Sequence, residues 1–271
     1  MLFNVYFSAK GTTQKCANYI ADILSTDNVS KNLLDFTELN HFDLTSNDVL
    51  LLSMPVYGGF IPHHCIEMIK QIKGNNTPAI ILAIFGNRHF DNALLQMQDL
   101  VEANGFKVIA AGAFLAEHSI FPSVAQGRPD AEDYAYMKHF AEKCSAILSS
   151  NNWQNKMLIV PGDKNYDPTV FKGVPFHPEA NDDCTNCQKC VNICPMHAIN
   201  ASNPKATNAE ICISCGACIK ACPVKARDYH SLMYKTAKAG FELKCKEKKY
   251  PSTFFIADIT SYLTPGKEST Y

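Results

Sequence analysis

The sequence predicts an α/β fold, in which a parallel sheet covered by helices on both faces is followed by a small cysteine-rich domain. Three observations support this prediction. Apolar runs and helical patterns alternate through the first 150 residues, two copies of one cysteine pattern follow, and a proline-rich segment separates the two parts. At 271 residues, of which 46% are hydrophobic, the chain is long enough for two domains and a sizeable core.

The alternation in the first part indicates a parallel sheet, because nearly continuous apolar strands must be buried on both faces. The predicted strands are 2–7, 33–34, 49–52, 79–85 and 107–115. Helices are expected at 12–25, 63–73, 91–104 and 130–148. Sheets of this kind bind ligands beyond the carboxyl ends of their strands. We therefore expect a site in the loops that follow the strands.

The first of these loops has the composition of a phosphate site. It follows the first predicted strand, opens a helix, and contains Ser8, Lys10, Gly11, Thr12 and Thr13. Hydroxyl groups and backbone N–H groups at a helix N-terminus can converge on a phosphate. Serine and threonine before a helix also commonly cap it, so phosphate binding and simple capping are both open at this point.

The second and third loops have the composition of a site for a flat ring. The second contains Pro55, Val56, Tyr57, Gly58 and Gly59, and the third contains Gly86, Asn87, Arg88, His89 and Phe90. A glycine pair lets the backbone approach a ring closely. Arg88 can stabilise negative charge on a reduced ring, or it can pair with its own loop. Three such loops at one edge of the sheet predict a binding site there.

Eight of the twelve cysteines repeat one pattern at an interval of 28 residues. The two copies are Cys184-x2-Cys187-x2-Cys190-x3-Cys194-Pro195 and Cys212-x2-Cys215-x2-Cys218-x3-Cys222-Pro223. This spacing is typical of bacterial ferredoxin domains with two [4Fe-4S] clusters, in which the fourth cysteine of each run binds the other cluster. We therefore assign Cys184, Cys187, Cys190 and Cys222 to one cluster, and Cys212, Cys215, Cys218 and Cys194 to the other.

Zinc and disulfides explain the cysteines less well. Zinc ribbons use separated Cys-x2-Cys pairs and need no third cysteine in register followed by Cys-Pro. Disulfides belong mainly to secreted chains, and the first ten residues lack the basic start of an export signal. The scattered cysteines Cys16, Cys65, Cys144 and Cys245 are expected to be apolar fillers.

Charge and hydropathy exclude two classes of partner. The formal net charge of −1 argues against a nucleic-acid partner, and no apolar run approaches the roughly 18 residues of a membrane span. We expect a cytoplasmic protein with no nucleic-acid or membrane partner. Iron-sulfur cofactors suggest an anaerobic or low-oxygen host.

Together, the three loops and the double cysteine motif resemble the EFR1-type family of flavodoxin-ferredoxin fusions over roughly residues 1 to 230. The resemblance implies a flavodoxin-like, doubly wound, five-stranded parallel sheet of order 2-1-3-4-5, followed by a small α+β bacterial ferredoxin domain. It also implies FMN beside the two clusters. The phosphate would be held by Ser8, Lys10, Gly11, Thr12 and Thr13, and the ring by Pro55, Val56, Tyr57, Gly58, Gly59, Gly86, Asn87, Arg88, His89 and Phe90.

This organisation divides the chain into four segments. We expect a flavodoxin-like FMN-binding domain at 1–150, a proline-rich linker at 151–181 that packs along it, a ferredoxin domain at 182–230 and a C-terminal extension at 231–271. The extension contains a basic helical patch and a strand-like run, Phe254 to Ile256. The patch is either a solvated face or a docking site for an acidic partner.

Electron counting suggests the function, because a cluster transfers one electron and a flavin can accept one or two. We expect an iron-sulfur flavoprotein that couples the clusters to the flavin and exchanges electrons with a ferredoxin-like donor or acceptor. Two alternatives are a flavin-dependent reductase of a small substrate and a ferredoxin with an empty flavodoxin-like docking domain. No catalytic residue is assigned, although His89 and Asp91 deserve a test in the reductase case. If the nearer cluster faces solvent far from the ring, a homodimer or a partner protein must complete the path.

Overall fold

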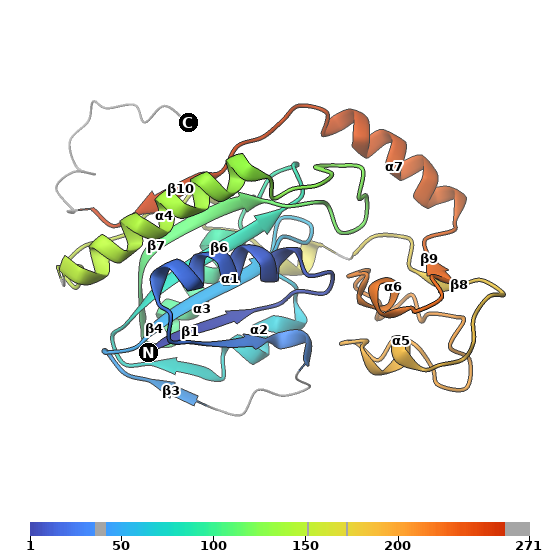
Figure 1. Ribbon diagram of the computed structural model, residues 1–271, viewed down its shortest axis with the longest axis horizontal. Helices are drawn as coiled ribbons and strands as arrows, with labels where there is room; N and C mark the ends of the chain where they lie inside the picture. The colour runs from blue at the N-terminus through green and yellow to red at the C-terminus, as the bar shows by residue number, and fades with distance from the viewer. Residues whose placement is uncertain (36–41, 151, 172, 258–271) are drawn as a thin grey trace.

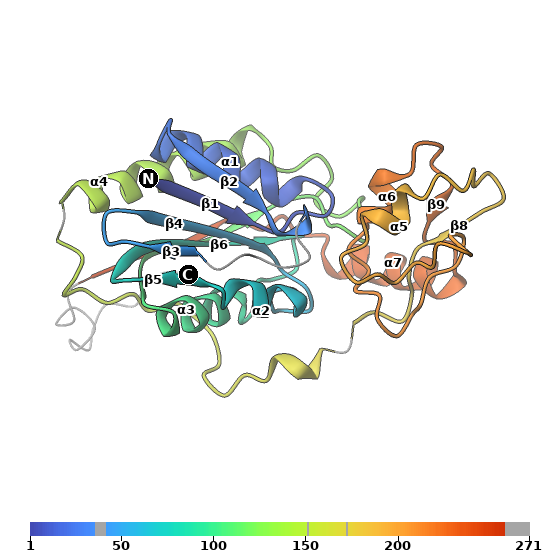
Figure 2. The same cartoon turned by 90° about the horizontal axis from the view of Figure 1, so that it is seen from below.

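The computed structural model describes residues 1–35, 42–150, 152–171 and 173–257. A sheet with helices on both faces forms the larger part, and a smaller domain lies beyond one end of that sheet (Figure 1). None of the described helices is both long and apolar enough to cross a membrane. The smaller domain faces the loops that end the parallel strands, so the fold brings the two parts of the chain together at the predicted site (Figure 2).

Five parallel strands form the sheet, in the order predicted. They are β1 (Leu2–Tyr6), β2 (Asn28–Asn32), β4 (Val49–Pro55), β6 (Thr77–Phe85) and β7 (Phe106–Leu115). Their spatial order, β2-β1-β4-β6-β7, corresponds to 2-1-3-4-5. All nine residues of β6 are buried, as a central strand covered on both faces requires.

The second strand was predicted in the wrong place. Residues 33–35 form a short 3₁₀ helix, η1 (Leu33–Asp35), and the strand is the preceding polar segment, β2. β2 lies at the edge of the sheet and is half-buried, so it has no continuous apolar run. Leu33 is apolar because it is buried in the core at the end of that strand.

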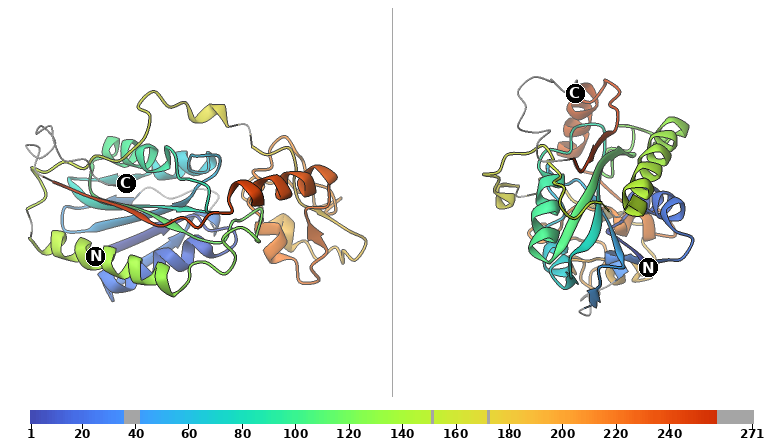
Figure 3. Two further views of the ribbon diagram at one scale, coloured as in Figure 1. Left: turned by 90° about the horizontal axis from the view of Figure 1, so that it is seen from above. Right: turned by 90° about the vertical axis from the view of Figure 1, so that its left-hand side faces the viewer.

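The C-terminal extension adds a sixth strand to the sheet. β10 (Ser252–Phe255) pairs antiparallel with β7, and an isolated bridge joins Met157 to Ala257. The remaining strands form two small two-stranded sheets. One pairs β3 (Phe42–Leu44) with β5 (Ile72–Gly74), and the other pairs β8 (Glu179–Ala180) with β9 (Arg227–Asp228). The extension therefore returns to the first domain; its last part, 258–271, lies outside the described residues (Figure 3).

Two helices cover each face of the sheet. α1 (Thr12–Leu24) and α4 (Ala131–Ser150) lie on one face, and α2 (His64–Ile69) and α3 (Ala93–Ala103) lie on the other (Figure 2). α2 ends earlier than predicted because β5 begins soon after it.

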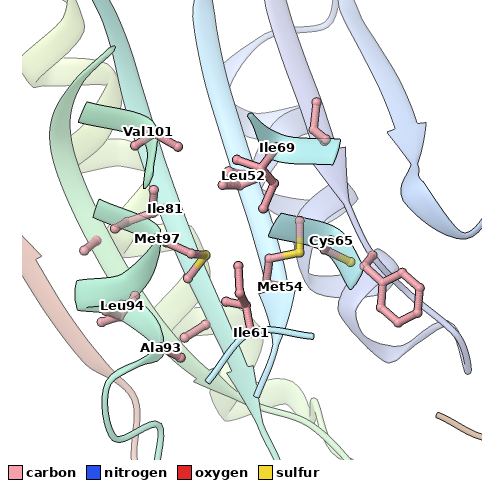
Figure 4. Close-up of a cluster of buried hydrophobic side chains, with 14 of the residues drawn as sticks. Leu52, Met54, Ile61, Cys65, Ile69, Ile81, Ala93, Leu94, Met97 and Val101 are labelled. Atoms are coloured by element: carbon pink, nitrogen blue, oxygen red, sulfur yellow. The ribbon is translucent and has the colours of Figure 1, made fainter. Parts of the chain in front are cut away.

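The buried side chains of these helices and strands fill two cores, one on each side of the sheet. On the α2 and α3 side, Leu52 and Met54 of β4 face Met97 of α3, and Cys65 of α2 lies among them (Figure 4). On the other side, Cys16 and Cys144 are fully buried. Burial raises the pKa of the Cys16 thiol to about 12. These cysteines act as apolar filler, as predicted.

The linker runs along α3 before it enters the small domain. The Tyr166 hydroxyl donates to Asp99 Oδ2 at 2.9 Å, and the Asp163 N–H donates to Asn92 Oδ1 at 2.8 Å. A short 3₁₀ helix, η2 (Pro168–Val170), follows. These contacts hold the linker against the first domain.

The small domain contains α5 (Lys189–Asn192) and α6 (Ala217–Ala221), and α7 (Leu232–Lys244) follows it. An aromatic cluster packs α7 and the end of the linker against the loop after β7. Phe121 of that loop contacts Phe176 of the linker and both Tyr234 and Phe241 of α7. The position of the small domain is thus held by packed side chains.

Candidate functional site

The loops that follow β1, β4, β6 and β7 meet the small domain around one cavity of about 430 Å³. That volume lies in the range of roughly 300–1,000 Å³ typical of pockets for cofactors and other small molecules. Most of the lining is apolar; the polar residues come from the start of α1, from the loops after β6 and β7, and from the small domain, and include Thr12, Thr13, Arg88, His89, Glu117, His118, Ser119 and Ser214. The predicted site edge is therefore a partly open cavity between two domains.

Nine of the predicted ring and phosphate residues line this cavity: Thr12, Thr13, Pro55, Val56, Tyr57, Gly58, Gly86, Arg88 and His89. Ser8, Lys10, Gly11, Gly59, Asn87 and Phe90 are not part of its lining. All three predicted loops thus reach the same space, but only some residues of each loop face it.

Asn87 instead forms hydrogen bonds with the C-terminal extension. Its side-chain amide donates to the carbonyl groups of Cys245 and Glu247, both at 2.8 Å, and its oxygen accepts from Lys249 N at 3.0 Å. Phe90 is buried in the core against Phe85. Neither residue lines the cavity. The role of Asn87 could not be predicted locally, because its partners in the extension lie more than 150 residues away in the sequence.

The N-terminus of α1 contributes Thr12 and Thr13 to the cavity lining. Gly11, the residue before the helix, has φ 93° and supplies no side-chain cap, and the first turn has no acidic residue. Ser8 Oγ accepts from Gln14 N at 3.0 Å, so Ser8 orders the loop while Thr12 and Thr13 face the cavity. The positive end of the helix dipole therefore points at a space that suits an anion.

Two lysines from different domains lie at this end. Lys10 Nζ donates to Ser119 O at 3.2 Å, and burial lowers the pKa of Lys10. Lys220 of α6 reaches the same loop, since a Cβ built on Gly11 would lie 2.9 Å from Lys220 Nζ. The small domain thus adds a positive charge to the predicted phosphate loop.

The ring loops are shaped by tight turns and close contacts. Tyr57 N donates to Phe60 O at 2.7 Å, and Gly58 and Gly59 have φ 61° and 95°, values that glycine adopts at no steric cost. A Cβ on Gly86 would lie 2.6 Å from the ring of His118. Glycine at this position lets the loop after β7 approach the loop after β6.

Arg88 pairs with its own loop, one of the two roles weighed for it. It donates to the Asp91 carboxylate, and His89 Nδ1 accepts from Asp91 N at 2.8 Å. Asp91 is therefore engaged with both neighbours, and this loop is a closed hydrogen-bonded unit at the cavity wall.

Sequence reasoning missed the covering side of the cavity. That side includes Phe171 and Phe176 of the linker, Ile213 and Ser214 between two cysteines, and Phe241 of α7. These segments come from distant parts of the chain, and no local pattern marks them.

His118, in the loop after β7, also lines the cavity, and burial lowers its pKa to about 4, with smaller effects from Lys10 and Arg88. Its ring is neutral near pH 7, and Nδ1 accepts from the N–H groups of Ile120 and Phe121, both at 3.1 Å.

The eight paired cysteines surround two smaller cavities. One is lined by Cys194, Cys212, Cys215 and Cys218, and the other by Cys184, Cys187, Cys190 and Cys222. The fourth cysteine of each run thus lies with the other run, in the crossed arrangement expected from the spacing. Within the described ranges, no three His, Cys, Asp or Glu side chains are placed to hold a single metal ion.

The surroundings of these sulfur atoms suit thiolates bound to the positively charged iron-sulfur core of a cluster. Ala198 N donates to Cys194 Sγ at 3.3 Å, and Ser214 N donates to Cys212 Sγ at 3.4 Å. Burial raises the pKa of Cys218 to about 11 and that of Cys215 further. Thiols this deeply buried ionise only when a positive charge compensates them, and cluster iron supplies that charge.

The two cysteine cavities differ in their distance from the first domain. Cys215 and Ala217 belong to the same buried cluster as the core under β4 and α3. Ile213 and Ser214 line both the large cavity and the cavity of Cys194, Cys212, Cys215 and Cys218. We call the cluster site in this cavity the inner site, and that of Cys184, Cys187, Cys190 and Cys222 the outer site.

Known families match both parts of the chain. The flavodoxin domain family matches residues 4–114, and the 4Fe-4S dicluster domain family matches residues 183–234. The second match implies two 4Fe-4S clusters. No curated protein matches the chain.

Solved flavodoxins are similar to the first part of the chain. The flavodoxin of Streptococcus pneumonia TIGR4 is 17% identical, with a TM-score of 0.38, over 54% of this chain and 99% of its own. Oxidised flavodoxin 1 of Bacillus cereus is 15% identical, with a TM-score of 0.39, over 52% of this chain and 95% of its own. On the evidence of the two family matches, the chain is a fusion of an N-terminal flavodoxin domain and a C-terminal 4Fe-4S dicluster domain.

Proposed function

We propose that this protein transfers electrons between two [4Fe-4S] clusters and an FMN bound in the large cavity. The observation that carries the proposal is the wall shared by two cavities. Ile213 and Ser214 border both the space lined by the flavodoxin loops and the inner cluster site. Electron transfer through protein falls off steeply with distance, so cofactors on the two sides of one short segment are well placed to exchange electrons.

The large cavity fits FMN at both ends. A phosphate would be held at the N-terminus of α1 by Thr12 and Thr13, with Lys10 and Lys220 supplying positive charge. The ring would lie between the loops that contain Tyr57 and His118, where the lining is mostly apolar. When bound, FMN supplies the ability to accept electrons singly or in pairs, whereas each cluster carries one at a time.

The residues between the two sites are held in place by hydrogen bonds. Ser214 is 2% exposed; its hydroxyl donates to Phe176 O at 2.8 Å, and its carbonyl accepts from the Tyr229 hydroxyl at 2.8 Å. Tyr57, at the cavity wall, has a raised pKa, first because of burial and then because of nearby Cys215. The separating segment is therefore buried and anchored by hydrogen bonds, which favours a fixed separation between the two sites.

The outer site supports the entry of electrons from a partner protein. Cys187 is exposed, whereas Cys215, at the equivalent place in the inner site, is 7% exposed. We propose that a ferredoxin-like donor or acceptor docks near Cys187 and that electrons pass through the outer cluster to the inner one. This path lies within one chain, so it requires no second copy of the protein.

The cover of the large cavity favours electron transfer over reduction of a small substrate. Phe171 and Phe176 of the linker, together with Phe241 of α7, line the cavity on the side away from the sheet. In the reductase hypothesis a substrate would have to displace this cover to reach the ring. The engaged Asp91 also offers no free acid or base beside His89.

Anaerobic purification followed by flash reduction tests the proposal. We expect the purified protein to contain FMN and two clusters, and electrons to redistribute between flavin and cluster absorbance bands at a rate independent of protein concentration. A rate proportional to concentration would show transfer between molecules and would contradict the proposal. Cluster-loaded protein that binds no added FMN would favour the docking-domain alternative.

A further inference from the structure

Arg227 is a buried charge at a position where the other repeat has an apolar residue. It lies in β9 and is 1% exposed. The residue 28 positions earlier in the first repeat is Ile199, which is 4% exposed. An isoleucine is buried there at no electrostatic cost, whereas burying a guanidinium is unfavourable unless its charge is compensated. Its neighbours must therefore supply that compensation.

The hydrogen-bond partners of Arg227 are neutral. Nη1 donates to Pro204 O at 2.6 Å, and Nη2 donates to Pro178 O at 3.1 Å and to the Thr207 hydroxyl. Nε is buried and has no partner. In the part of the chain that the structure describes, no carboxylate forms an ion pair with this guanidinium. Carbonyl and hydroxyl oxygens satisfy its N–H groups but do not balance its charge.

The neighbours that become anionic are the cluster cysteines. Arg227 lines the outer site. Pro204, which accepts from Nη1, also lines the outer site, whereas Pro178 and Thr207, which accept from Nη2, line the inner site. One guanidinium thus lies between the two sites.

We propose that Arg227 is the shared counter-charge of the two clusters and raises the reduction potential of both. A cluster with four thiolate ligands is negatively charged, and its net charge is one of the quantities that set its potential. Each added electron makes the cluster more negative, so a fixed positive charge nearby stabilises the reduced form more than the oxidised form. Arginine suits this role because its planar guanidinium spreads the charge over several N–H donors that can be satisfied at once.

Redox titrations of the full-length, cluster-loaded protein test this role. Arg227→Met removes the charge, Arg227→Lys keeps it, and Thr207→Val removes a hydrogen-bond partner while leaving the guanidinium in place. We expect Arg227→Met to lower the midpoint potentials of both clusters by about 59 mV or more, equivalent to a tenfold change in the one-electron reduction equilibrium. The lysine and valine variants should remain close to the wild-type protein.

The result that overturns the proposal is an Arg227→Met protein with unchanged potentials, or Arg227→Lys and Thr207→Val shifts as large as that of Arg227→Met. Iron and sulfide analysis covers the case in which Arg227→Met assembles no clusters. If Arg227→Lys then loads both clusters, a positive charge is required at this position, which supports the proposal. If Arg227→Lys also fails to load, the arginine acts through its hydrogen bonds, and the proposal is wrong.

Discussion

The two cysteine repeats of the dicluster domain have the same spacing but different surroundings. In the second repeat Cys215 and Cys218 are buried, and Cys215 packs with the core of the flavodoxin domain. In the first repeat Cys187 is exposed. The two repeats have the same cysteine ligands, but they differ in their contacts: the second packs on the flavodoxin domain and the first is exposed. The inner site contacts the flavodoxin domain, whereas the outer site has an exposed cysteine, Cys187.

Two further positions show how the second repeat is adapted to this contact. Gly216 replaces Gln188 of the first repeat; both have a positive φ, but a Cβ on Gly216 would lie 3.1 Å from Lys10 Cδ. Lys220 replaces Asn192 and reaches the phosphate loop of the flavodoxin domain. Each difference falls where the second repeat meets the flavodoxin domain.

The largest effect is expected when a crossed ligand is removed. Cys194→Ala should abolish the inner cluster although Cys194 lies in the first repeat, because its sulfur lines the inner site. The small domain has little apolar core, so the loss of a cluster should also lower its stability. Iron and sulfide analysis with spectroscopy of the remaining cluster measures this. Cys144→Ala, which alters a buried filler of the flavodoxin domain, is the control and should retain both clusters.

Loss of the same cluster in Cys194→Ala and Cys187→Ala would contradict the crossed arrangement. These two cysteines belong to one run in the sequence but line different sites in the structure. In an uncrossed domain, both cysteines would bind the same cluster, so both variants would lose that cluster and keep the other.

Acidification tests whether His118, in the loop after β7, is kept neutral by its burial beside the dicluster domain. The pKa of His118 is about 4 when folded, lowered first by burial, against about 6.5 when unfolded. Between these values the unfolded chain binds a proton that the folded chain does not, so stability falls as pH decreases from about 6.5 to 4. At pH 5 this linkage costs about 2 kcal/mol relative to pH 7.

His118→Asn removes the titrating group and keeps an acceptor near the N–H groups of Ile120 and Phe121. Anaerobic urea denaturation of both proteins at pH 7 and pH 5 measures the difference. The variant should lose about 2 kcal/mol less on acidification than the wild-type protein. Equal losses would mean that His118 is not held neutral by its surroundings.

A smaller effect is expected for the lysine that the second repeat contributes. Lys220→Met should weaken FMN binding about tenfold, the size of one charge-assisted hydrogen bond. Binding of riboflavin, which lacks the phosphate, should be unchanged. Flavin fluorescence titration measures both affinities. Lys189→Met removes an exposed lysine of the first repeat and is the matched control; an equal effect of the two substitutions would remove the distinction between the repeats.

The local parts of this architecture could be predicted from sequence. The parallel sheet follows from the alternating pattern and the cysteine partners from a spacing that is itself short-range, whereas the strand order came from the resemblance to flavodoxin-ferredoxin fusions. The contacts between distant segments could not. Nothing near Asn87 indicates that it binds the extension around Cys245, and nothing in Phe171 or Ile213 indicates that both line the same cavity. Such contacts arise only when the dicluster domain packs on the flavodoxin domain.

The central claim is that the inner cluster, and not the outer one, exchanges electrons directly with the flavin. Flash reduction of two full-length variants loaded with FMN tests it: Cys184→Ala removes a ligand of the outer site, and Cys212→Ala a ligand of the inner site. Cluster content is measured first, to establish which cluster each variant retains. We predict that Cys184→Ala keeps rapid, concentration-independent transfer between flavin and cluster and that Cys212→Ala loses it. Rapid transfer in a Cys212→Ala protein that retains only the outer cluster would contradict the account.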